Sequence, residues 1–253
     1  MKRFAVALLL SVPALIGSSS ARADRRLFTS TYEYKTVPEG HTALEFWHTE
    51  SRDTWDANTS QHMEHILEIE HGITDHWDAA LYTVLTQDAA GVGHDGVAEP
   101  GAPLSLHAMN LETRYRFADR GEWPVDVLAY GEVSKEFGAS VYEIEGKAIV
   151  ARDFDALLVA ANLIGEVEVG HDVPETEVEL GWAVGASYEV HPKFNFGIET
   201  FGSYEEEKGA QALIGPAFAF APSGGLWATF TAGFGLNDNS PAMQGRLILG
   251  VEL

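Results

Sequence analysis

Apolar residues occupy every second position along most of this chain from Met63 onward. In the clearest stretch the apolar positions are Val178, Leu180, Trp182, Val184, Ala186, Tyr188 and Val190, and the positions between them are Glu177, Glu179, Gly181, Ala183, Gly185, Ser187 and Glu189. A period of two is typical of a β-strand with two different faces. Because one face is apolar and the other carries carboxylates and glycine, the pattern predicts a closed membrane barrel, apolar outside and polar inside.

About twelve segments carry this alternation, an even number, as a single-chain bacterial barrel requires. Each is roughly nine to fifteen residues long, which is enough to cross a membrane at a tilt, whereas strands of soluble sandwiches are shorter. The fold expected is all-β, a single antiparallel transmembrane β-barrel. The predicted strands are Thr42–Glu50, Gln61–Ile73, His76–Thr86, Ser105–Phe117, Pro124–Lys135, Ser140–Arg152, Asp155–Val169, Thr176–Val190, Lys193–Ser203, Ala210–Ala221, Leu226–Leu236 and Met243–Leu253.

The connections alternate in length, and this alternation orients the barrel. The short connections are expected at the periplasmic end. They are Thr74-Asp75, Asp153-Phe154, His191-Pro192, Pro222–Gly225 and the somewhat longer Ala118–Trp123. The other set is longer on average and is expected outside the cell. It comprises Ser51–Ser60, Gln87–Leu104, Gly170–Glu175, Tyr204–Gly209 and Asn237–Ala242, with Glu136–Ala139 as a short exception. Both termini are then periplasmic.

Outward-facing aromatic residues collect beside the short connections. Aromatic rings prefer the headgroup region of a membrane, so these residues predict a girdle at one interface. The girdle residues are Trp77, Tyr115, Phe117, Tyr188, Phe194, Phe196, Phe218 and Phe220. Trp182 lies in mid-strand and departs from this rule.

The start of the chain predicts export. Lys2 and Arg3 precede an apolar run from Phe4 to Ile16, and Ala21-Arg22-Ala23 has the spacing of a cleavage site. Residues 1–23 are therefore expected to be a signal peptide, residues 24–40 a polar periplasmic lead-in and residues 41–253 the barrel. The chain has no cysteine, which excludes a disulfide framework and a lipoprotein anchor.

The composition is acidic, with 38 Asp and Glu residues against 16 Lys and Arg residues. Such a charge repels nucleic acid and favours cations, and a hydrophobic content of 45% excludes a disordered acidic chain. The stretch from Glu68 to Asp75, followed by Tyr82, is similar to the early hairpin of bacterial outer-membrane β-barrel proteins. The chain as a whole resembles the uncharacterised and transporter-like barrels of Gram-negative bacteria, and Leu247, Leu249, Val251 and Leu253 resemble their terminal assembly signal, although those chains usually end in an aromatic residue.

This resemblance implies a place in the outer membrane, in contact with lipid and lipopolysaccharide, insertion by the barrel-assembly machinery, and passive passage of small solutes. The predicted inward face carries more acids than bases, so a lumen that prefers cations or polar solutes is expected. The selectivity candidates are Glu64, Glu68, Glu112, Arg114, Arg116, Glu143, Glu145, Lys147, Glu166, Glu179, Glu199 and Arg246. An interior plugged by ion pairs remains the alternative. Barrels of about 8 strands are filled by side chains and barrels of about 16–18 strands contain a water channel, and a barrel of about twelve strands has an intermediate size.

The sequence offers candidates for three other functions. The histidines include His62, His65 and His71, but no set of three or four convergent ligands is readable, so no metal site and no cofactor are expected. Ser105 and His107 share a face and could form a lipid-hydrolase pair, although no orienting carboxylate or amide is evident; no catalytic residue is therefore proposed. The long loops could serve surface contacts, and a soluble β-sandwich is the alternative fold.

Overall fold

The computed structural model describes residues 25–253 except residues 94–95, 174–175, 177, 207 and 224. The predicted signal peptide, residues 1–23, lies outside the described residues. None of the described residues forms a helix long and apolar enough to cross a membrane.

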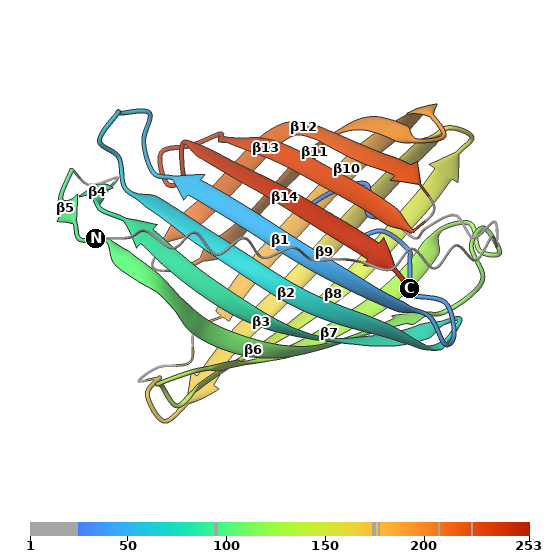
Figure 1. Cartoon of the computed structure of the whole chain (residues 1–253), viewed down its shortest axis with the longest axis horizontal. Coiled ribbons are helices and arrows are strands. Elements are labelled where there is room, and N and C mark those ends of the chain that lie inside the picture. Colours follow the sequence, from blue (N-terminus) through green and yellow to red (C-terminus); the bar gives the residue numbers. More distant parts are fainter. Residues whose placement is uncertain (1–24, 94–95, 174–175, 177, 207, 224) are drawn as a thin grey trace, which may run out of the picture.

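Twelve antiparallel strands close into one barrel (Figure 1). The circle is completed by the pairing of the first strand with the last, where Phe46 lies opposite Leu249. Two very short strands form a hairpin in the longest loop. The barrel strands are β1 (Thr42–Arg52), β2 (Gln61–Thr74), β3 (Trp77–Ala89), β6 (Ala102–Arg116), β7 (Asp126–Glu136), β8 (Val141–Phe154), β9 (Leu157–Gly170), β10 (Val178–His191), β11 (Phe194–Glu205), β12 (Gly209–Ser223), β13 (Leu226–Gly235) and β14 (Met243–Glu252), and the loop hairpin is β4 (Gly91–Val92) and β5 (Ala98–Glu99).

All twelve predicted strands are confirmed, with shifted ends. The tight turn predicted at Asp153-Phe154 lies two residues later, where Asp155 has a φ of 55°. An aspartate tolerates this left-handed conformation better than most residues, which fixes the turn there. The loop predicted as Gln87–Leu104 is shorter than expected, because β3 and β6 extend into it and β4 pairs with β5.

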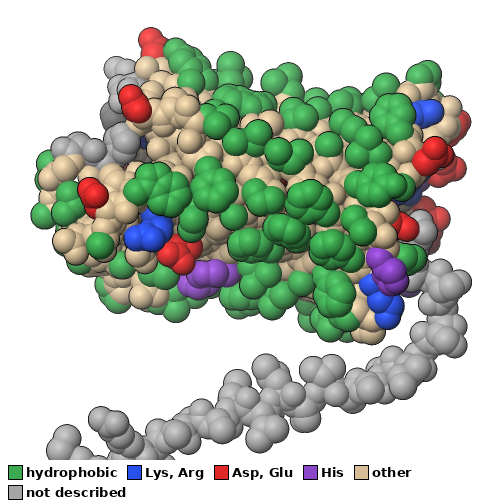
Figure 2. Space-filling view, turned by 90° about the horizontal axis from the view of Figure 1, so that it is seen from above, with side chains coloured by type: hydrophobic (Ala, Val, Ile, Leu, Met, Phe, Trp, Pro, Cys, Tyr) green, Lys and Arg blue, Asp and Glu red, His purple; other side chains and the backbone are tan. Residues whose placement is uncertain are grey.

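The outer surface is apolar along the body of the barrel. Leu111 and Leu163 lie in the middle of their strands and are 59% and 67% exposed, and Figure 2 shows hydrophobic side chains over the visible face with carboxylates toward its two ends. An exposed apolar band on a closed barrel fits contact with lipid. The polar positions between these residues point into the lumen, where Glu112 and Glu199 are each 1% exposed.

The segment predicted as a periplasmic lead-in instead runs inside the barrel. Phe28 and Thr31 are fully buried, Tyr34 is 2% exposed, and the Tyr32 backbone nitrogen donates a hydrogen bond to Asn162 Oδ1 on β9 at 2.7 Å. The polar composition of the segment predicted contact with water, but polar residues are equally compatible with a polar lumen. We call residues 25–37 the internal segment.

Glycine on the inward face makes room for this segment. A Cβ atom placed on Gly185 in β10 would lie 2.6 Å from the Phe28 ring, which is closer than atoms can pack. Phe28 thus reaches the β10 backbone, and it belongs to a buried apolar cluster with Leu128, Ile149 and Ile248. The inward glycine here serves packing, not contact with water.

Candidate functional site: an acidic vestibule in the lumen

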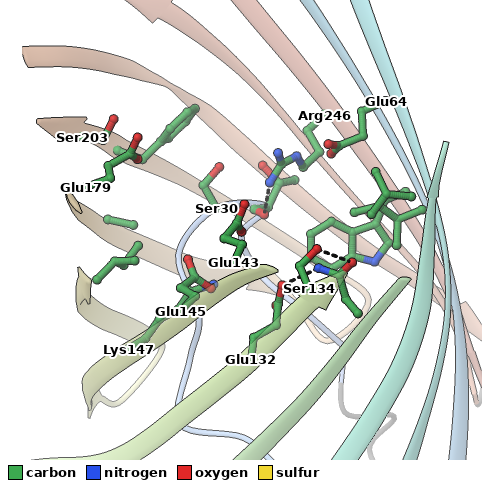
Figure 3. Close-up of a pocket in the computed structure, with 18 of the residues that line it drawn as sticks. Ser30, Glu64, Glu132, Ser134, Glu143, Glu145, Lys147, Glu179, Ser203 and Arg246 are labelled. Atoms are coloured by element: carbon green, nitrogen blue, oxygen red, sulfur yellow. Dashed lines mark hydrogen bonds and ion pairs between the residues drawn. The ribbon is translucent and has the colours of Figure 1, made fainter. Parts of the chain in front are cut away.

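The lumen is divided into two unlike halves. We call the half beside the long loops the loop side and the half beside the tight turns the turn side. A cavity of about 550 Å³ occupies the loop side, and we call it the vestibule. Its floor is formed by Thr29, Ser30 and Tyr32 of the internal segment, of which Figure 3 labels Ser30.

Carboxylates line the vestibule because the alternation brings glutamates of neighbouring strands into register. Glu132 on β7 lies directly opposite Glu145 on β8, and both line the cavity with Glu143 and Glu179. Glu64 on β2 and Arg246 on β14 also line it, and Figure 3 shows them close together and apart from Glu143, Glu145 and Glu179. Like charges directly opposite each other on a sheet repel, and a cation beside these carboxylates would relieve that repulsion.

Lys147 supplies a positive group on this wall. Its Nζ atom lies 2.8 Å from Glu145 Oε1, 4.3 Å from the Tyr32 ring centre and 4.1 Å from the Tyr130 ring centre. An ammonium group between a carboxylate and two aromatic faces is favoured by both the ionic and the cation–π attraction. The wall is thus able to hold an alkylammonium group, and the chain's own lysine demonstrates the geometry.

Glu199 on β11 fastens the floor. Its carboxylate accepts hydrogen bonds from the backbone nitrogens of Thr29, Ser30 and Thr31 at 3.0, 3.0 and 2.9 Å, and from the Thr29 and Thr31 hydroxyls at 2.9 and 3.1 Å. Hydrogen bonds to an ionised acceptor are stronger than neutral ones. One buried carboxylate therefore anchors three consecutive residues of the internal segment.

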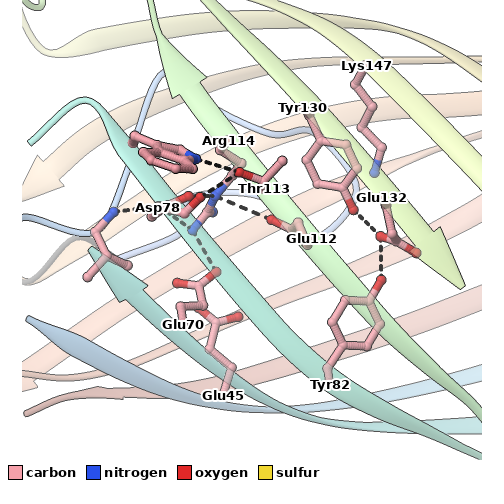
Figure 4. A network of polar contacts seen from close by, with 12 residues as sticks. Glu45, Glu70, Asp78, Tyr82, Glu112, Thr113, Arg114, Tyr130, Glu132 and Lys147 are labelled. Atoms are coloured by element: carbon pink, nitrogen blue, oxygen red, sulfur yellow. Dashed lines mark hydrogen bonds and ion pairs between the residues drawn. The ribbon is translucent and has the colours of Figure 1, made fainter. Parts of the chain in front are cut away.

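The turn side contains an ion-pair network centred on Arg114 (Figure 4). The Arg114 guanidinium contacts Asp78 Oδ2 and Glu70 Oε1 at 2.8 Å each, and Glu112 Oε1 at 3.3 Å. All four side chains are at least nine-tenths buried. Buried charges of this kind persist only when they are paired, so this half of the lumen is filled by mutually dependent charges.

Arg26 brings a second cation to the turn side. Its Nη1 atom lies 4.0 Å from Glu45 Oε2, and its guanidinium lies over the rings of Tyr32 and Trp47 at 4.0 and 4.5 Å. Glu45, Glu68 and Glu70 place carboxylate oxygens within 4.8 Å of one another, a spacing that could hold a metal ion. Arg114 contacts Glu70 and Arg26 contacts Glu45, so Glu45 and Glu70 have arginine as their counter-charge.

The structure separates the predicted selectivity residues into groups. Those that line the vestibule are Glu64, Glu68, Glu143, Glu145, Lys147, Glu179 and Arg246. Glu112, Arg114 and Glu199 are buried in the packing below it, and Arg116 donates a hydrogen bond to the Asp75 carbonyl at a tight turn. Glu166 lies beside Glu145 and Glu179 in the strand register. Face alternation located these side chains inside, but it gave no sign of which half the internal segment would fill.

Several residues of the site were missing from the predicted set. Arg26, Thr29 and Tyr32 belong to a segment without periodicity, so no sequence signal pointed to them. Glu132 has the same inward alternation as its neighbours, and it accepts hydrogen bonds from Tyr82 Oη, Tyr130 Oη and Asn110 Nδ2. That alternation was the signal that could have placed Glu132 in the site.

The predicted aromatic girdle lies beside the tight turns. Seven of its eight side chains are exposed, while Phe194 is half-buried; the seven are Trp77, Tyr115, Phe117, Tyr188, Phe196, Phe218 and Phe220. Neighbouring members contact one another, with ring centres 5.4 Å apart for Tyr115 and Phe117 and 5.3 Å apart for Phe196 and Phe218. Their depth in a membrane stays a prediction.

The arrangement of Ser105 and His107 differs from the pair on one face of the strand that a lipid hydrolase would need. The pairing of β3 with β6 shifts register between Val84 and Leu85, opposite His107. His107 lines the vestibule, with its Nε2 atom 3.8 Å from Glu136 Oε1. The bulge thus turns this imidazole toward the lumen and away from the lipid-facing position that the hydrolase reading requires.

Comparisons with known proteins agree with this architecture. A model of a family of unknown function (DUF6662) matches residues 20–240, and no curated protein matches the sequence. The solved structure of the KdgM porin in complex with disordered oligogalacturonate matches with a TM-score of 0.54 and 9% identity, over 83% of this chain and 97% of that one. The NanC porin matches with a TM-score of 0.53 and 9% identity, over 83% of this chain and 98% of that one. The fold is that of a porin-like outer-membrane β-barrel.

Proposed function

Because the chain belongs to the family of unknown function DUF6662, its role has to be inferred from its own geometry, and we propose that it is a porin-like channel for small cations and polar solutes. The barrel lies in the outer membrane, with its apolar surface in contact with lipid. Solutes enter the acidic vestibule from the loop side and leave at the turn side by a route that the internal segment controls.

One observation supports this proposal above the others, namely the acidic vestibule itself. It is a cavity of about 550 Å³ whose wall carries Glu64, Glu143, Glu145 and Glu179. Rings and walls of carboxylates raise the local concentration of cations and repel anions. Among the described lining residues, the lysine and arginine side chains are Lys147 and Arg246, and these four acids outnumber them.

The internal segment sets the conductance. Residues 29–31 of this segment are held by Glu199 in the middle of β11, and the segment fills the turn side together with the Arg114 network. Ions therefore pass freely only when this segment moves aside. The mature protein is expected to conduct weakly, and a variant that lacks residues 25–37 is expected to conduct more strongly.

The test is the conductance of the purified protein in planar bilayers, with a gradient of KCl across the membrane. We expect a reversal potential that favours K⁺ over Cl⁻, and a smaller preference in the variant Glu143→Gln/Glu179→Gln. The matched control, Glu122→Gln/Glu189→Gln, removes the same charge outside the vestibule and should keep the preference. Preference for Cl⁻, or equal loss in both variants, would contradict the proposal.

A second candidate function is solute binding without passage, and the filled turn side favours it. The same bilayer experiment separates the two functions. If the variant without residues 25–37 folds and still shows no conductance at any voltage, the protein is a plugged barrel and its vestibule is a binding site only.

A further inference from the structure

A row of six glutamates winds along the inner wall of the barrel. On each of the adjacent strands β6 to β11 one inward glutamate lies directly opposite the next, and we call these six residues the carboxylate row: Glu112, Glu132, Glu145, Glu166, Glu179 and Glu205. Directly opposed like charges destabilise a sheet. Five such pairs in succession therefore need positive counter-charges.

The row descends from the rim to the turn side. Glu205 is the last residue of β11 at the loop side, and Glu179 is the second residue of β10. Glu112, at the other end, is four residues from the turn-side end of β6 and contacts Arg114. Because strands in a barrel are tilted, positions that lie opposite one another trace a slope through the lumen.

Lysine or arginine side chains pair with the two terminal glutamates of the carboxylate row and with one glutamate between them. Lys208 Nζ lies 2.8 Å from Glu205, Lys147 Nζ lies 2.8 Å from Glu145, and Arg114 contacts Glu112. Among the residues that the structure describes, Glu166 and Glu179 have no ion-pair or hydrogen-bond partner, and the same holds for Glu143 beside them. The stretch nearest the vestibule mouth thus keeps uncompensated negative charge.

A second observation concerns Glu68, another carboxylate that lines this cavity. Glu68 lines the vestibule and is 6% exposed, yet its Oε1 atom has no hydrogen-bond donor among the described residues. A buried carboxylate oxygen without a donor costs free energy, which a positive ligand at the vestibule floor would relieve. Lys147, held between Glu145 and two tyrosine rings, shows that this wall accepts a primary ammonium.

The spacing of the row identifies the class of cation. Neighbouring strands lie about 4.8 Å apart, so consecutive carboxylates of the row repeat at about that distance. Standard bond lengths separate the nitrogens of a three- or four-carbon diamine by about 5–6 Å. We propose that the vestibule binds linear di- and polyamines, whose successive ammonium groups lie along Glu145 and Glu179 in the cavity wall and Glu166 between them in the strand register. This inference rests on the proposed function, because it names a solute for the same vestibule.

Isothermal titration of the detergent-purified mature protein tests the inference without reference to conductance. The probes are spermidine, 1,4-diaminobutane, n-butylamine as the single-amine comparison, and Mg²⁺. We expect spermidine to bind at least about tenfold more tightly than n-butylamine or Mg²⁺, since each additional ammonium–carboxylate contact contributes about a factor of ten. Equal affinity for spermidine and n-butylamine, or for spermidine and Mg²⁺, would overturn the proposal.

Two variants locate the binding. Glu166→Gln/Glu179→Gln should weaken spermidine binding by about tenfold or more, while Glu122→Gln/Glu189→Gln, with the same change of net charge, should leave it within about twofold. Single Glu179→Gln, near the rim, serves if the double variant does not fold. Unchanged binding in the row variants would refute the site. Binding that persists in a protein without cation preference in bilayers would refute the channel but keep this site.

Discussion

The two halves of the lumen are built from the same alternating strands, yet one is filled by paired charges and the other encloses a cavity. On the turn side, Asp78, Glu112 and Arg114 are buried and joined in one network (Figure 4). On the loop side, Glu143 and Glu179 line a cavity and have no cationic partner among the described residues (Figure 3). The comparison shows two roles for inward carboxylates. Those in contact with an arginine or with the internal segment stabilise the fold, and those without such a contact remain available for a ligand.

The largest effect is expected from removing the central cation of the turn side. Arg114→Met leaves Asp78, Glu70 and Glu112 as buried carboxylates without their shared counter-charge. Breaking a buried pair in this way costs about 3–5 kcal/mol of unfolding free energy. Urea unfolding in detergent, followed by tryptophan fluorescence, measures the loss.

The loop side supplies the control for that experiment. Lys208 is largely exposed and pairs with Glu205 at the rim. A pair whose lysine lies in solvent contributes about 0–1 kcal/mol, and although its partner Glu205 is 8% exposed, Lys208→Met should cost much less unfolding free energy than Arg114→Met. Similar losses for the two variants would remove the distinction between the halves.

A smaller loss is expected when the anchor of the internal segment is weakened. Glu199→Gln replaces a carboxylate that accepts five hydrogen bonds from residues 29–31. An amide keeps one acceptor oxygen and no charge, so the loss should be about 2–3 kcal/mol. Limited proteolysis should also cut the internal segment faster in Glu199→Gln than in Glu179→Gln; equal rates would show that Glu199 does not hold the segment.

The packing of the internal segment against the wall predicts the next effect. Gly185→Ala places a methyl group 2.6 Å from the Phe28 ring, whereas Gly165→Ala on β9 meets no atom within 4 Å. Overpacking costs about 1–3 kcal/mol, so only the first variant should lose stability. Phe28→Leu combined with Gly185→Ala should recover part of the loss, and the absence of any recovery would argue against this contact.

The smallest effect has the opposite sign. Glu166 lies directly opposite both Glu145 and Glu179. Removing a repelling charge from a cross-strand pair stabilises a sheet by about 0.2–1 kcal/mol. Glu166→Gln should therefore raise the unfolding free energy slightly at low ionic strength and less at high salt. A loss of stability at both salt concentrations would mean that Glu166 has a structural partner.

The alternation predicted the strands and their faces because successive side chains of a strand point to opposite sides of the sheet, a property that depends only on residues adjacent in the sequence. Trp182 and Glu179 fall on opposite faces of β10 for this reason, although the partly buried Trp182 also lines the vestibule. The internal segment could not be predicted, because Thr29 and Thr31 bind Glu199, about 170 positions later in the chain. The polar residues of the internal segment are compatible with water and with a polar lumen alike. The open and the filled half were therefore indistinguishable from the sequence alone.

Thiol accessibility tests most directly whether the internal segment closes the turn side, and the chain has no cysteine to interfere. Ser203→Cys places a thiol in the vestibule wall, and Thr229→Cys places one where the Thr229 hydroxyl contacts the Arg26 carbonyl. A hydrophilic maleimide should modify Ser203→Cys rapidly in the protein that retains residues 25–37, and it should modify Thr229→Cys only after deletion of these residues. Equally fast labelling of Thr229→Cys with and without the segment would contradict the account.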